Sequence, residues 1–184
     1  FVFGCTVALR VSDIFKLSTS NIESVNGKHY LKVISQKTNT FTRVVLPDYA
    51  MEIIHKYPKN KKTIFPEISN ARFNLNIKSL IERTGWTDDR TKSRHRRGVP
   101  VAVYKNEKSK TPYRFCDLIT SHTMRRTAIT TMLCLNMPEN LVRKISGHAP
   151  NSKEFFRYVQ LSQRYMDTET EKMFDQLKSK ELVA

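Results

Sequence analysis

Two clusters in the C-terminal half of the chain carry side chains that can hold an anion and attack it. His122 and Arg125 are three residues apart, and His148 follows Gly147 and lies ten residues before Tyr158. Arginine presents a planar fork of N–H donors that matches phosphate oxygens, and a tyrosine hydroxyl is a nucleophile. Since no carboxylate belongs to the set, it suits a phosphate better than a metal ion. The residue types therefore indicate chemistry on a nucleic-acid backbone.

Two further cations precede these clusters. Arg10 follows an apolar segment at the start of a predicted helix, and Lys37 lies in a polar turn between two predicted strands. Taken singly, each residue has an ordinary structural role: Arg10 in a surface ion pair, Lys37 solvated at a turn, Tyr158 as a core or rim aromatic. His122 and Arg125, at positions i and i+3 of one predicted helix, are expected to face the same way.

Charge is the strongest compositional signal. The 184 residues include 32 Lys or Arg against 17 Asp or Glu, which gives a formal net charge of +15. A surplus this large favours a polyanionic partner, although a solvated basic surface has the same composition. With 39% hydrophobic residues, the chain is long enough to bury the core of one domain.

Several other classes find no support in the sequence. No stretch approaches the roughly 20 apolar residues of a membrane span, and we find no signal peptide. Cys5, Cys116 and Cys134 have neither disulfide nor zinc-site spacing, which is typical of buried thiols in a cytosolic protein. The sequence begins at Phe1 rather than at a methionine, so we expect a further N-terminal part outside it.

The elements that must position these residues follow from local patterns. Strands are predicted at 22–25, 30–34 and 41–46, and the Asn26-Gly27 turn with the polar residues 35–40 makes them an antiparallel meander. Helices are predicted from apolar periodicity and from the positions of proline and glycine. The helical ranges are 13–17, 47–57, 69–84, 122–135, 139–145, 153–161 and 168–177.

The segment 90–114 is strongly basic, with nine Lys or Arg and one acid, Glu107. A strand is predicted at 99–104 within it. A charge run of this kind is either a disordered loop or a segment that follows phosphates. For the second interpretation, the predicted DNA-contacting residues are Arg90, Lys92, Arg94, Arg96, Arg97 and Lys105.

The order and spacing of the candidate residues resemble the catalytic domain of the tyrosine recombinases, the phage-integrase family. That family has an early arginine, a hairpin lysine, a His-x-x-Arg helix, a Gly-His pair and then a tyrosine, and the resemblance covers nearly the whole chain. It implies an α+β, mainly α fold, the DNA breaking-rejoining fold, in which a helical catalytic domain carries a small antiparallel three-stranded sheet. The matching catalytic positions are Arg10, Lys37, His122, Arg125, His148 and Tyr158.

The resemblance implies a role for each residue. Tyr158 would attack a DNA phosphorus, displace the 5′-hydroxyl and form a 3′-phosphotyrosyl link. Arg10, Arg125 and His148 would stabilise the charge that develops on the non-bridging oxygens.

Proton transfers fall to two other residues in this scheme. Lys37 would protonate the leaving oxygen, and His122 would assist proton transfer from the tyrosine or hold the phosphate. A phenol with a pKa near 10 needs such help at neutral pH. The resemblance implies neither a cofactor nor a metal ion.

The departures from the family pattern remove no catalytic group. They are Met124 where leucine is usual, Arg126 where histidine is frequent, an unusual loop at 149–154 and a long basic insertion at 86–117. Tyr165 is a second tyrosine nearby, but its distance from His148 is less typical of the family, so Tyr158 is the better candidate nucleophile.

The resemblance also predicts domain boundaries and partners. Residues 1–166 would form the catalytic domain, and 167–184 a C-terminal helix exchanged between protomers through an apolar face that includes Met173 and Phe174. A core-binding domain would precede the sequence. The expected partners are double-stranded DNA, further copies of the chain in a tetramer on DNA, and host DNA-bending factors, without a membrane. The expected location is the cytoplasm, in association with the nucleoid.

The predicted function is site-specific DNA recombination that integrates or excises a mobile element. Three alternatives stay open: a type IB topoisomerase-like enzyme that relaxes DNA, a non-catalytic DNA-binding protein of the same fold, and a basic RNA-binding or structural protein. The apolar tail helix favours protomer exchange over relaxation. The presence of all six catalytic positions disfavours a non-catalytic protein.

Overall fold

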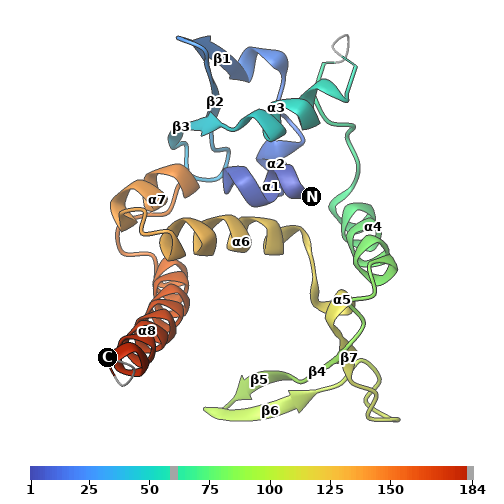
Figure 1. Ribbon diagram of the computed structural model, residues 1–184. Helices are drawn as coiled ribbons and strands as arrows, with labels where there is room; N and C mark the ends of the chain where they lie inside the picture. Colours follow the sequence, from blue (N-terminus) through green and yellow to red (C-terminus); the bar gives the residue numbers. More distant parts are fainter. Residues whose placement is uncertain (59–61, 182–184) are drawn as a thin grey trace. The chain divides into compact units, whose positions relative to one another are not determined.

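The computed structural model describes residues 1–58 and 62–181 of the 184-residue chain. The chain divides into two compact units. The first comprises Phe1–Glu67 together with Met124–Ala184, and the second comprises Ile68–Thr123. Figure 1 labels the helices and strands of both units.

The first unit combines short N-terminal helices and a small sheet with three helices from the C-terminal part of the chain. Its N-terminal elements are α1 (Val2–Val7), α2 (Val11–Ile14), the 3₁₀ helix η1 (Thr19–Asn21), β1 (Ile22–Val25), β2 (Lys28–Ile34), β3 (Phe41–Leu46) and α3 (Asp48–His55). Its C-terminal elements are α6 (Ser121–Cys134), which begins in the second unit, α7 (Glu139–Ser146) and α8 (Lys153–Glu181).

The three strands of the first unit form an antiparallel sheet in the order β1-β2-β3. β1 and β2 are joined at Asn26-Gly27, where φ is 50° and 73°. A two-residue hairpin needs positive φ at both positions to match the twist of its strands, and Asn-Gly tolerates this conformation. The predicted strands are confirmed, except that β2 begins at Lys28 rather than at residue 30.

The sequence prediction contains no helix at 2–7, where α1 lies, and it places the start of α2 two residues too late. α1 has no polar face to reveal it, and Gly4 within it lowers its helix propensity. Tertiary packing stabilises it instead: a methyl group on Gly4 would lie only 2.6 Å from Met124 Sδ. α3, α6 and α7 are confirmed to within two residues at each end.

The core of the first unit lies where the end of α1 meets α6, α7 and α8. Phe155 is fully buried, and truncation of such a phenylalanine costs about 3–5 kcal/mol. Tyr158, which is 5% exposed, belongs to the same cluster. The packing that stabilises the unit therefore also fixes the start of α8. The buried members are Ala8, Ala128, Ile129, Leu133, Val142, Phe155 and Tyr158.

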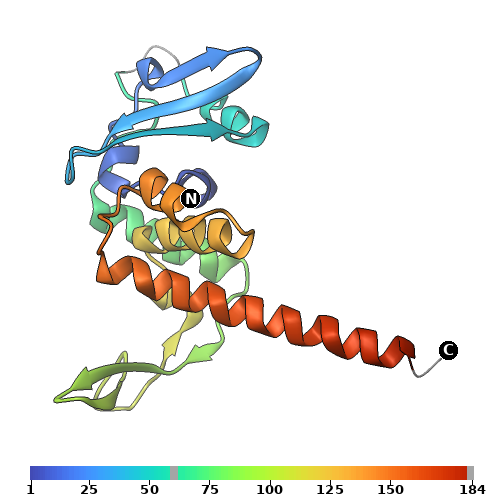
Figure 2. The ribbon, with the colours of Figure 1, turned by 90° about the vertical axis from the view of Figure 1, so that its left-hand side faces the viewer.

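One prediction for the C-terminal region is wrong. A single uninterrupted helix, α8, replaces the two helices expected at 153–161 and 168–177 (Figure 2). Residues 162–167 contain neither glycine nor proline, so nothing in the backbone ends the helix between them. The predicted apolar face lies on α8 with Met173, Phe174 and Leu177 about half exposed. None of the helices in the described ranges is long and apolar enough to cross a membrane.

The second unit carries the basic segment as a folded ribbon rather than as a disordered loop. Its β5 strand was not part of the sequence prediction, whereas β6 matches the strand predicted at 99–104 to within one residue. Arg97 and Gly98 join the two strands with φ of 52° and 82°, the same turn geometry as in the first sheet. The elements are α4 (Asn70–Arg83), β4 (Asp89–Arg90), β5 (Lys92–Arg96), β6 (Val99–Val103), β7 (Tyr113–Arg114) and α5 (Phe115–Leu118).

Candidate active site

Among the described residues of the first unit, Arg125 is the most deeply buried cation, with 4% of its surface exposed. Its Nη1 donates to the carbonyl oxygen of Ala8 at 2.8 Å, and its Nη2 donates to that of Ser146 at 2.5 Å. Two of its five N–H donors are therefore held by backbone oxygens. Within residues 1–58 and 62–181 it forms no ion pair with a carboxylate. The guanidinium is fixed in direction without being neutralised.

A second guanidinium lies near the first. Arg10, at the start of α2, donates from Nη1 to Ser35 Oγ at 2.8 Å, and Ser35 Oγ donates in turn to Asp13 Oδ2 at 3.3 Å. Burial and the charge of Arg10 lower the pKa of Arg125 to about 10, although Tyr158 and Asp13 act in the opposite direction. Like charges held near each other are costly unless an anion joins them, so the pair suits an anionic ligand.

His148 lies beside both arginines. Its ring nitrogens are 3.3 and 3.4 Å from Arg125 Nη2. Burial, followed by the charges of Arg125 and Arg10, lowers the pKa of His148 to about 4. The imidazole is therefore neutral at neutral pH.

A serine hydroxyl fixes the tautomer of this imidazole. Ser146 Oγ donates to the carbonyl oxygen of Val142 at 2.6 Å and lies 2.8 Å from His148 Nδ1. A hydroxyl has one hydrogen, so Nδ1 donates to Ser146 Oγ, and Nε2 keeps its lone pair. The ring can therefore accept a proton or a hydrogen bond at Nε2.

Tyr158 lies on the first turns of α8, against the histidine. The centroid of its ring is 5.9 Å from that of His148 and 6.3 Å from that of Phe155. Arg143 is stacked over Phe155, with the guanidinium carbon 4.0 Å from the ring centroid. Tyr165, seven residues further along α8, is 50% exposed and does not belong to this buried cluster.

Gly147 brings the β2–β3 turn to the cluster. It ends α7 in the left-handed region, at φ 63°, which favours glycine. A methyl group there would lie 3.5 Å from Thr38 Oγ1 and 4.0 Å from Arg10 Nη1, so the turn packs directly against this residue. Lys37 lies on the same turn with an exposed side chain. The lysine is thereby placed at the rim of the cluster.

His122 lies in the first turn of α6, is exposed, and belongs to the second unit. The first unit therefore brings together Arg10, Arg125, His148 and Tyr158, with Lys37 on the adjoining turn. In the described ranges, no group of three or more His, Cys, Asp or Glu could hold a metal ion.

Sequence reasoning did not single out the groups that hold these side chains. Ser35 fixes Arg10, and Ser146 fixes both Arg125 and His148. Ser146 is 2% exposed and Ser35 5% exposed, and buried hydroxyls are usually hydrogen-bonded. Only their position in the sequence could have indicated these serines, because each lies two residues before a candidate residue. Ser35 precedes Lys37, and Ser146 precedes His148.

The six predicted DNA-contacting residues all lie in the second unit, and they fall into two groups. Arg90 pairs with Asp88 at 3.7 Å, and the ammonium of Lys105 lies 2.9 Å from Asp117 Oδ1. By contrast, the remaining four form no ion pair within the described part of the chain. They are Lys92, Arg94, Arg96 and Arg97.

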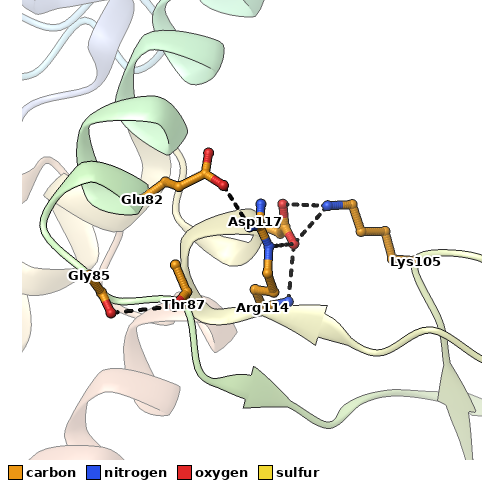
Figure 3. Close-up of polar contacts among 6 residues, drawn as sticks. All are labelled: Glu82, Gly85, Thr87, Lys105, Arg114 and Asp117. Carbon is orange, nitrogen blue, oxygen red and sulfur yellow. Dashed lines mark hydrogen bonds and ion pairs between the residues drawn. The ribbon is translucent and has the colours of Figure 1, made fainter.

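The ion pair of Lys105 belongs to a network at the base of the ribbon (Figure 3). Asp117 also accepts from the backbone N–H and from Nε of Arg114, whose Nη1 donates to Glu82 Oε1 at 2.6 Å. Although burial opposes it, the hydrogen bonds from Lys105 and Arg114 lower the pKa of Asp117 to about 2. Lys105 thus has a structural partner.

Comparison with known proteins identifies the family. The model of the phage integrase family matches residues 3–164, and the chain belongs to this family. This confirms the resemblance drawn from the six residues. No curated protein matches the sequence.

Solved structures of similar fold include those of the site-specific recombinase XerH and of XerA recombinase. XerH in a post-cleavage complex with its palindromic difH substrate superposes with a TM-score of 0.60 at 12% identity, over 92% of this chain and 44% of that one. The pre-cleavage XerH complex gives 0.55 at 13%, over 89% and 43%. XerA recombinase gives 0.51 at 13%, over 89% and 56%. The chain thus spans about half the length of these recombinases, and their likeness confirms the predicted fold class.

Proposed function

We propose that the chain is the catalytic part of a tyrosine-type DNA strand transferase that performs site-specific recombination. The observation that carries this proposal is the pair of neighbouring guanidinium groups, Arg10 and Arg125, beside a neutral His148 and the ring of Tyr158. A phosphodiester is an anion that two arginines can bind through several N–H donors, and a tyrosine next to it is placed for attack.

The reaction is a transesterification. The hydroxyl oxygen of Tyr158 attacks phosphorus, the bond from phosphorus to the 5′-oxygen breaks, and a 3′-phosphotyrosyl link forms. The tyrosine proton passes to a base, and the leaving 5′-oxygen takes a proton from Lys37, the role implied by the family. Attack by the freed 5′-hydroxyl of a second strand reverses these steps and rejoins the DNA.

Arg10 and Arg125 stabilise the charge that builds on the non-bridging oxygens. Because backbone carbonyls already fix Arg125, little reorganisation is needed when the charge develops. Removal of one such donor lowers the rate by about 10²–10³ in comparable oxyanion sites.

His148 changes its protonation state in this scheme. In the free protein its Nε2 carries a lone pair, and burial together with the two arginines keeps the ring neutral. A bound phosphate offsets their charge and raises the pKa of the histidine, so that Nε2 can take up a proton and donate to a phosphate oxygen. His122 is proposed to assist proton transfer, as the family pattern implies.

The remaining assignments also belong to this proposal. Double-stranded DNA is the substrate, the C-terminal segment 167–184 exchanges between protomers of a tetramer, and a core-binding domain precedes residue 1. Integration or excision of a mobile element, with host DNA-bending factors, is the proposed role in the cytoplasm, in association with the nucleoid. The half-exposed apolar side chains of α8 support protomer exchange rather than DNA relaxation by a topoisomerase-like enzyme.

A nicked suicide duplex tests the proposed chemistry. The protein is incubated with duplexes from the ends of its own element, and SDS-resistant protein–DNA adducts are scored for wild type, Tyr158→Phe and the matched control Tyr165→Phe. We expect adducts for wild type and Tyr165→Phe and none for Tyr158→Phe, with duplex binding preserved in all three. DNA binding without any adduct would favour a non-catalytic DNA-binding protein of the same fold.

A further inference from the structure

The β5–β6 ribbon has one face that is rich in positive charge. Residues of a strand alternate between its two faces, so Lys92, Arg94 and Arg96 share a face. The register pairs them with Val103, Val101 and Val99, and places Ser93 and His95 on the opposite face. All residues of the ribbon but Val103 are exposed. The basic side chains therefore form a single row in solvent.

Among the described residues, no carboxylate forms an ion pair with this row. Residues 90–106 contain no Asp or Glu, and in the described ranges Lys92, Arg94 and Arg96 form no ion pair. The ammonium of Lys92 lies 4.6 Å from the centroid of the Tyr113 ring, which leaves its charge in place. Arg90 and Lys105, in contrast, are paired with carboxylates at the base of the ribbon.

The base of the ribbon is held firmly. Asp117 accepts hydrogen bonds from Lys105 and Arg114, and Trp86 contacts Phe115 edge to face with 5.6 Å between ring centroids. These contacts fix where the chain enters and leaves the ribbon, and Figure 3 shows the hydrogen bonds to Asp117 among them. A fixed base lowers the entropy that the row loses on binding a ligand.

We propose that the β5–β6 ribbon is a second DNA-binding element, which contacts the phosphate backbone of duplex DNA through the face of Lys92, Arg94 and Arg96. The inference rests on DNA as the partner in the proposed function, but not on the chemistry of Tyr158. From Lys92 to Arg96 the row spans about 13 Å, at about 3.3 Å per residue. That length is close to the major groove, which is about 12 Å wide and admits a two-stranded β-ribbon.

Salt dependence of binding tests this inference. Fluorescence anisotropy measures the affinity of the chain for a labelled duplex at a series of salt concentrations, with Tyr158→Phe in every protein so that no covalent product forms. Log affinity falls linearly with log salt. We expect Arg94→Gln with Arg96→Gln to make this fall less steep by about 1.8, since each phosphate contact contributes about 0.9 to the slope. An unchanged slope and affinity would overturn the proposal, as would the absence of duplex binding in the parent protein.

A permuted ribbon provides the matched control. Residues 93–96 read Ser-Arg-His-Arg, and the permutation Arg-Ser-Arg-His keeps composition and net charge while it moves both arginines to the opposite face. We expect the permutation to reduce the steepness of log affinity against log salt by as much as Arg94→Gln with Arg96→Gln does. If it binds like the parent while the neutralised protein is weakened, net charge alone acts and the assignment to one face is wrong. The binding measurements do not depend on covalent chemistry, so they stand even if the wild-type protein forms no adduct in the suicide-substrate assay.

Discussion

The cluster around Arg125 and the β5–β6 ribbon both present cations, but they do so in opposite ways. Arg125 is almost fully buried and held by two carbonyl oxygens, and its charge adds to burial in lowering the pKa of His148. The ribbon's basic row is exposed on a two-stranded support. A buried charge acts strongly on one nearby group and is little affected by salt, whereas exposed charges act weakly and are screened. The first arrangement suits chemistry on a single phosphate, and the second suits attachment to many.

The largest expected effect is at the buried guanidinium. Arg125→Lys keeps the charge but loses the planar fork that reaches both carbonyl oxygens, so the rate of adduct formation should fall by about 10²–10³. Single-turnover kinetics on the suicide duplex measure this rate. Arg126→Lys, at the exposed neighbouring position on α6, is the control and should change the rate little. Equal rates for the two variants would remove Arg125 from the active site.

The functions of the two regions should respond differently to salt concentration. Between 50 and 200 mM salt, the affinity for duplex DNA should fall at least tenfold, because it depends on several exposed phosphate contacts. The rate of adduct formation from the saturated complex should change much less, because the cluster is buried. Titration of the duplex at each salt concentration yields both quantities. A rate that falls in parallel with the affinity would contradict the contrast between the regions.

The anchor of the ribbon offers a test of stability. Asp117→Asn removes a carboxylate that accepts from Lys105 and twice from Arg114, and should lower the free energy of unfolding by about 1–3 kcal/mol. Glu107→Gln is the matched control, since Glu107 and Lys110 form an ion pair with both side chains 66% exposed. Its effect should stay within about 0.5 kcal/mol. Urea denaturation measures both changes, and equal effects would show that the network does not anchor the ribbon.

A pH dependence of stability is also expected at His148. Its pKa is about 4 in the folded protein and near 6.5 when unfolded, so between these values the unfolded chain binds more protons. Stability should therefore fall as the pH is lowered from about 6.5 to 4. In His148→Asn the fall should be smaller, as measured by urea denaturation at pH 7, 6, 5 and 4.5. The same fall in both proteins would mean that the histidine is not held neutral.

Much of the fold is predictable because local patterns determine it. Asn26-Gly27 between alternating strands specifies the meander, and Gly147 marks the end of α7. α1 could not be predicted, because its stability comes from the close approach of Gly4 to Met124, residues 120 positions apart in sequence. α8 was divided wrongly in the prediction, although its middle contains no helix-breaking residue.

The candidate site, like the fold, is predictable from the sequence only where it does not depend on tertiary packing. The spacing of Arg125, His148 and Tyr158 predicts a shared site, and the structure places them together with Arg10 in one unit. The carbonyl oxygens that orient Arg125 and the Ser146 hydroxyl that fixes the imidazole tautomer could not be predicted. They depend on how α1, α6 and α7 pack, and the residue type does not show which side chain a backbone oxygen will bind. The catalytic roles stay predictions.

Mapping of the covalent attachment tests the central claim most directly. Tyr158 follows Arg157 and Tyr165 follows Arg164, so trypsin separates the two tyrosines into the peptides 158–164 and 165–172. An adduct formed on the suicide duplex is digested with nuclease and trypsin, and the peptide that retains a nucleotide phosphate is identified by mass spectrometry. We predict that the modified peptide is 158–164, which contains Tyr158, alone or joined to residues 154–157 by a missed cleavage. Modification of the Tyr165 peptide, or of any other, would contradict the assignment of the buried cluster as the active site.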